Sequence, residues 1–98
     1  MNISHILSVE ELRDGGSLIV SFQSDDSCVY WLMFPKAGYE GEKVVFGSPA
    51  LINRTTSIEI KLDWSSANAW LHRLETYIVN GEHRNLIDKM QGVIDAHT

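Results

Sequence analysis

Histidine, cysteine and paired carboxylate side chains are the groups in this 98-residue chain with the right chemistry for catalysis or metal binding. No two of the four histidines stand three or four residues apart, the spacing that places two metal ligands on one face of a helix. His72 and His83 flank one predicted helix end, and Cys28 opens an apolar run. Solvated or capping histidines and a small buried thiol fit these positions better than a nucleophile with its base. An enzyme that uses His72, His83 or Cys28 is therefore the least favoured hypothesis.

The remaining polar signals predict turns. Asp25 and Asp26 are adjacent carboxylates, but a cation site needs further oxygen ligands, and a hairpin turn accounts for both. Gly38 and Gly41 lack the Lys-Ser/Thr pair of a phosphate loop and the following helix of a dinucleotide site. We therefore expect a protein that is not an enzyme and that has no cofactor and no metal.

Charge is distributed unevenly along the chain, whose formal net charge is −5. Residues 1–42 hold seven acidic and two basic residues, and residues 43–98 hold six of each. The basic residues are scattered singly, so nucleic acid is excluded as the expected partner. The acidic excess fits either a basic protein partner or simple solubility.

The elements that position these groups centre on the apolar run Cys28–Phe34. Seven residues are too few for a free-standing helix, and β-branched and aromatic types lead, so the run predicts a strand. Leu18–Gln23 alternates apolar and polar residues, and Ser24–Ser27 is a polar turn, so the two strands form an antiparallel hairpin. One face of the central strand carries Cys28, Tyr30, Leu32 and Phe34, and the other carries Val29, Trp31 and Met33.

The flanking segments give further elements. Asn2–Leu7 predicts a short edge strand or lead-in, and Ser8–Glu11 has the capping-box spacing of a helix start. Lys36–Gly41 predicts a loop. Three more strands are expected at Glu42–Gly47, at Ala50–Ile52, and at Ile58–Leu62 with Ile58, Ile60 and Leu62 pointing inward.

Two amphipathic helices end the chain. Asp63 or Ser65 caps the first, whose apolar positions recur from Ser66 until Asn80-Gly81 ends it. The second covers about Glu82–Ala96. Strands followed by helices predict a single α+β domain over residues 1–98 with an antiparallel sheet of about four to five strands and a C-terminal antiparallel helix pair on one face.

A central strand that is apolar on both faces leaves two alternatives for the face opposite the helices. Either the N-terminal segment folds over it, or Trp31 and its neighbours form an exposed apolar patch. Exposed patches ringed by charge are typical of protein-binding sites.

The whole chain, an acidic α+β sequence with aromatic-rich strands, a stretch VYWLMFP and a terminal helix pair, resembles the immunity proteins of bacterial polymorphic toxin and contact-dependent growth inhibition systems. That resemblance is one of type, since no diagnostic motif matches. It implies a protein that occludes the active site of a cognate toxin C-terminal domain, basic and nuclease-like. The N-terminus has no signal-peptide pattern and the longest apolar run is far too short for a membrane helix, so we expect a cytoplasmic protein with no membrane partner, either a monomer or a weak dimer. The residues expected to bind the partner are Glu10, Glu11, Asp14, Asp25, Asp26, Trp31, Tyr39, Glu40 and Glu42.

A second hypothesis needs no toxin. A small non-enzymatic adaptor, phage or regulatory domain would self-associate, or bind another protein, through the apolar strand Cys28–Phe34 or its neighbour. An aromatic-rich strand favours this as well as the first hypothesis.

Overall fold

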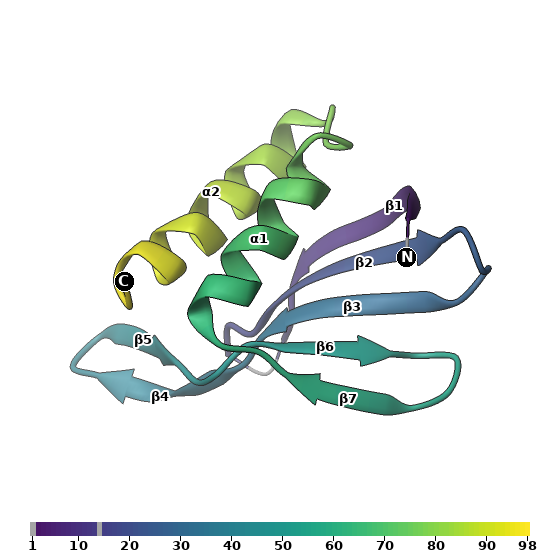
Figure 1. The fold of residues 1–98 in the computed structure, drawn as a ribbon. Helices are drawn as coiled ribbons and strands as arrows, with labels where there is room; N and C mark the ends of the chain where they lie inside the picture. Colours follow the sequence, from purple (N-terminus) through teal and green to yellow (C-terminus); the bar gives the residue numbers. More distant parts are fainter. Residues whose placement is uncertain (1, 14) are drawn as a thin grey trace.

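The computed structural model describes residues 2–13 and 15–98, which form a five-stranded sheet, a two-stranded hairpin and two C-terminal helices. The α+β fold with an antiparallel sheet and two terminal helices is confirmed (Figure 1). The strands are β1 (Ile3–Glu11), β2 (Leu18–Ser24), β3 (Val29–Phe34), β4 (Lys36–Glu40), β5 (Lys43–Phe46), β6 (Ala50–Asn53) and β7 (Ile58–Lys61), and the helices are α1 (Trp64–Glu75) and α2 (Gly81–Asp95).

The order of the main sheet is β1-β2-β3-β6-β7, and each neighbouring pair is antiparallel. The predicted hairpin of β2 and β3 is confirmed, with Leu18 opposite Phe34 and Gln23 opposite Val29. β3 is the central strand, and β2 and β6 pair with its two sides. Ser27 closes the β2–β3 turn with a positive φ of 68°, a conformation that short polar residues tolerate better than branched ones.

The prediction of a helix start at Ser8–Glu11 was wrong, because these residues belong to β1. β1 pairs with β2, and its register shifts between Ile3 and His5 and again between Ile6 and Ser8. Each shift adds one residue to the strand, so inward positions recur every three residues instead of every two. Ile3, Ile6 and Val9 follow this spacing, and it resembles a helical pattern.

The prediction of a loop at Lys36–Gly41 was also wrong. β4 pairs with β5 in a separate two-stranded sheet, and the Gly47 N–H donates to the Pro35 carbonyl at its base (2.8 Å). The hairpin lies against the β1–β2 turn, where a Cβ on Gly16 would be 3.6 Å from the Val44 side chain. The β5 segment was predicted as a strand, but it lies outside the main sheet.

Both helices lie on one face of the main sheet, α2 over β1 and α1 over β3 (Figure 1). The Asp63 carboxylate caps α1 by accepting from the Ser66 N–H at 2.7 Å, one of the two caps predicted. α1 ends at Glu75, earlier than predicted, and Asn80, which was expected to end it, instead caps α2 by accepting from the Glu82 N–H. The buried core between the layers includes Leu18, Val20, Phe22, Leu32, Phe34, Leu51, Leu71, Leu74, Ile87, Met90 and Ile94.

Candidate protein-binding surface

Two of the histidines contact side chains on the helices. His72 Nδ1 lies 3.4 Å from Glu75 Oε1, and the His97 ring stacks on Trp64 with 3.9 Å between ring centroids. Cys28 is half-buried, at the end of the β2–β3 turn. Among residues 2–13 and 15–98, no three His, Cys, Asp or Glu side chains form a group that could hold a metal ion.

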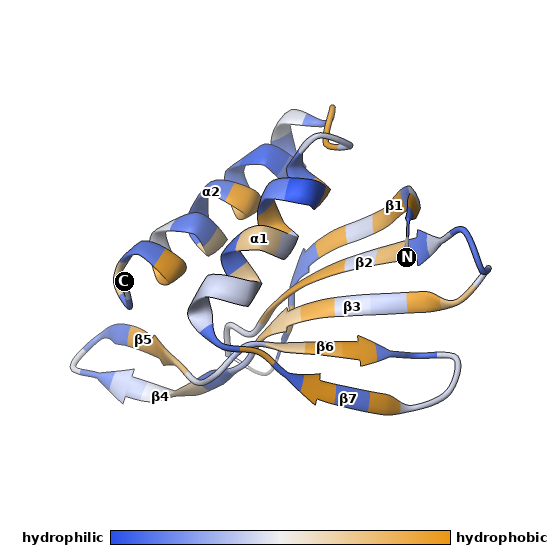
Figure 2. Ribbon diagram, in the orientation of Figure 1, coloured by the Kyte–Doolittle hydropathy of each residue, from blue (hydrophilic) through white to orange (hydrophobic). Residues whose placement is uncertain are grey.

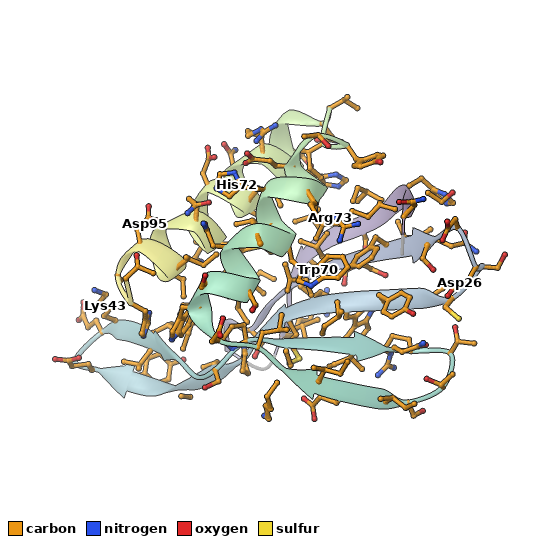
Figure 3. All side chains as sticks on the ribbon, viewed as in Figure 1. Asp26, Lys43, Trp70, His72, Arg73 and Asp95 are labelled. Atoms are coloured by element: carbon orange, nitrogen blue, oxygen red, sulfur yellow. The ribbon has the colours of Figure 1, made fainter. Side chains whose placement is uncertain are left out.

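The predicted acidic residues divide between two ends of the molecule. Asp25 and Asp26 form the β2–β3 turn at one end. Glu10 and Glu11 lie on β1 at the other end, opposite Ile19 and Leu18, and are not on a loop. Glu40 and Glu42 are exposed at the tip of the β4–β5 hairpin, which extends from the same end as Glu11, and Asp14 lies outside the described residues. Figure 3 shows the separation, with Asp26 and Lys43 at opposite extremes.

Some of these acidic side chains already have partners within the molecule. Glu11 Oε1 accepts from Lys89 Nζ of α2 at 2.8 Å. Asp26 accepts from the Ser24 hydroxyl and from the Cys28 N–H, and these two hydrogen bonds hold the pKa of its carboxyl below the ordinary value. Asp26 therefore has a role in the turn whether or not it binds a partner.

Tyr39 and Trp31, the two predicted aromatic contacts, lie in different places. Tyr39 is 59% exposed on β4, with Lys36 Nζ 4.5 Å from its ring centroid. Trp31 is half-buried on β3, opposite Ser21 of β2 and Ile52 of β6. Its side chain points away from the helices, because Leu32 and Phe34 of the same strand point into the core.

We use the name outer face for the side of the main sheet opposite the helices. One of the two alternatives was that the N-terminal segment folds over this face. In the structure, the N-terminal segment forms β1 and lies within the sheet. The register places six apolar residues together on the outer face. They are Ile19, Val29, Trp31, Met33, Ala50 and Ile52, of which Ile19 and Ala50 are buried and the others are half-buried.

Charged side chains border these apolar residues. The Arg54 guanidinium lies 4.1 Å from the Trp31 ring centroid, a cation–π contact that orients the indole. Glu10 lies beside Ile19 on the β1 side. Glu59 and Lys61 lie beside Ile52 and Ala50 on the β7 side. An apolar centre with a charged rim has the anatomy of a protein interface.

A hollow lies on the other side of the molecule from the outer face, between β5 and the end of α2. It has a volume of about 600 Å³, and its apolar lining includes Val44, Phe46 and Val93. Glu40, Lys43 and Lys89 line it as well, so its lining carries charges of both signs.

Two features of the surface were not predicted. Ile58 and Ile60 of β7 were expected to point inward, but they are 60% and 55% exposed because the helices cover β1 to β3 and do not reach β7. Figure 2 shows β7 alternating between hydrophobic and hydrophilic residues with no helix above it. The contact of Arg54 with Trp31 was also missed, because it depends on β3 and β6 being neighbours.

Comparison with known proteins gives no relative. No family model matches the chain, and no curated protein and no solved structure matches it. Neither helix of the described chain is long and apolar enough to cross a membrane.

Proposed function

We propose that this chain is an immunity-type protein that binds a cognate bacterial toxin domain and blocks its active site. The observation that carries the proposal is the outer face, where Trp31 stands among apolar side chains with a charged rim. A half-buried tryptophan in such a setting loses its remaining water on binding and is a typical energetic anchor. The resemblance of the chain to immunity proteins supports the same conclusion.

The acidic residues have a different role in this proposal. Glu40 and Glu42 are exposed at one end of the molecule, and Asp25 and Asp26 at the other, so none of them lies at the centre of the outer face. Charges in such positions accelerate association with a basic partner more than they strengthen the final complex. A net charge of −5 acts in the same direction.

Co-purification with the toxin domain encoded by the neighbouring gene tests the proposal. Trp31→Ala should weaken the complex at least about 30-fold, while Tyr77→Ala, an exposed aromatic beyond the end of α1, should change affinity less than about threefold. Melting temperatures of both variants separate a binding defect from unfolding. Absence of a tight complex with the unmodified chain would sink the proposal.

Charge reversal tests the steering role separately. Reversing Asp25, Glu40 and Glu42 together should slow association most at low salt and leave dissociation nearly unchanged, because exposed charges act at long range and are screened. An association rate that does not change would remove the steering role and leave the outer face as the whole site.

The second candidate is a non-enzymatic adaptor or regulatory domain. Its favouring observation is the exposed apolar side of β7. Self-association through an edge of β3 itself is ruled out, because β2 and β6 pair with both sides of that strand. A chain that ignores the toxin domain but assembles through its own sheet would belong to this class.

A further inference from the structure

β7 ends the main sheet and is exposed along its whole length. It is four residues long, it has no register irregularity against β6, and it carries Ile58 and Ile60 in solvent. A regular edge strand with exposed apolar residues is a template for pairing with another strand. The identity of that strand can be inferred from the backbone and the side chains of β7.

Two residues of β7 can form backbone hydrogen bonds with a partner strand. The Leu62 N–H donates to the Pro49 carbonyl of the neighbouring strand segment at 2.9 Å, so Leu62 and every second residue before it face β6. The N–H and C=O groups of Glu59 and Lys61 therefore point away from the sheet. These are the four groups that one added antiparallel strand would use.

The side chains of β7 are complementary to a second copy of the same strand. When two β7 strands pair antiparallel with Ile60 opposite Ile60, Glu59 of each copy stands opposite Lys61 of the other, and Ile58 stands opposite Leu62. Opposite charges directly across an antiparallel pair are favourable, as are apolar pairs. A shift of the register by two residues places Glu59 opposite Glu59, or Lys61 opposite Lys61. Such a register is unfavourable, because like charges then stand directly across the pair.

We propose that the chain forms a homodimer through antiparallel pairing of β7 with β7, in the register that centres on Ile60. The interface is isologous, and the pairing residues Glu59 and Lys61 are the ones whose backbone groups face outward. The two five-stranded sheets join into one, with both helix pairs on one side and both outer faces on the other. The dimer thus goes beyond the proposed function, because it presents two copies of the outer face side by side.

Charge exchange tests the register. Sedimentation of the native chain over a wide concentration range should show a monomer–dimer equilibrium. Glu59→Lys alone, or Lys61→Glu alone, should weaken the dimer about tenfold, and the double variant should restore it, because only this register exchanges the two charges across the twofold axis. A chain that stays monomeric at every concentration, or a double variant no better than the single ones, would overturn the proposal.

Cross-linking provides an independent test of the same register. In a Cys28→Ser background, Ile60→Cys should give a disulfide-linked dimer with oxidised glutathione, because residues opposite each other at the axis are within disulfide reach. Ile58→Cys is the matched control, since the two copies of that residue would be about 14 Å apart along the strands. Equal cross-linking at the two positions, or cross-linking only at position 58, would contradict the proposed register.

Discussion

The two edge strands of the main sheet, β1 and β7, differ in length, regularity and cover. β1 has nine residues and two register shifts, and α2 packs over it. β7 has four residues in regular register and no helix over it. Lys89 of α2 also bonds to Glu11 near the end of β1, whereas the charged residues of β7 point to the opposite side of the sheet.

The difference shows where this molecule is protected from pairing with other chains. Bulges and a covering helix are two of the ways in which proteins blunt an edge, and β1 has both. Two helices are too few to cover five strands, so the helix side of β7 stays in water. The open edge at β7 and an outer face without a helix over it therefore both follow from a single helix layer that is displaced toward β1.

The largest difference in stability between the two edges is expected when one isoleucine on each edge strand is changed to alanine. Ile3→Ala on β1 removes a side chain that is 7% exposed and should lower the free energy of unfolding by about 2 kcal/mol. Ile60→Ala on β7 should change the free energy of unfolding of the monomer by less than about 0.5 kcal/mol, because the Ile60 side chain is already largely in water. Chemical denaturation at low protein concentration measures both. Equal losses would show that the two edges are equally buried.

A smaller effect is expected from glycine at the two edges. Ser57, in the turn before β7, has φ = 64°, so Ser57→Gly should raise the free energy of unfolding by about 0.5 kcal/mol. Ser4→Gly within β1 should instead lower it by about 0.5 kcal/mol, since glycine loses more freedom in a strand. Thermal unfolding of the pair gives the two signs, and a decrease for Ser57→Gly would contradict the assigned turn conformation.

The smallest effect concerns the cap that follows β7. The hydrogen bond from the Ser66 N–H lowers the pKa of the Asp63 carboxyl below its ordinary 3.8. A carboxyl with a lowered folded-state pKa contributes stability above pH 3.8 and loses it as the pH falls through the folded value. Asp63→Asn keeps a capping oxygen without the ionisation, so its stability should depend less on pH below about 4. Identical acid-unfolding curves for the two proteins would refute this role.

The sequence predicted the helices and strands better than it predicted which of them lie side by side. The β2–β3 hairpin and both helices have local signals, namely alternation around a polar turn and apolar spacings of three and four. The second half of β1 was misread as a helix start because Ser8 and Glu11 have the spacing of a capping box. Ile60 lies on the helix side of the sheet, opposite the core residue Leu51, but it is exposed because the helices do not extend over β7. Alternation within one strand does not show how far the helix layer reaches.

The candidate site was predictable to a similar degree. Trp31 was identified on a face of β3 away from the core, where the structure places it. The acidic residues were treated as one half of the chain, but antiparallel strands carry neighbouring stretches of sequence to opposite ends of the sheet. Asp25 and Glu10 are therefore separated in space although both belong to the acidic half.

Amide hydrogen exchange at several protein concentrations tests the central claim, that β7 is the open edge and β1 the protected one. The N–H groups of Glu59 and Lys61 should exchange rapidly in dilute solution and more slowly as concentration rises, while exchange along β1 stays constant. Concentration-dependent protection along β1, or none at Glu59 and Lys61, would contradict the account.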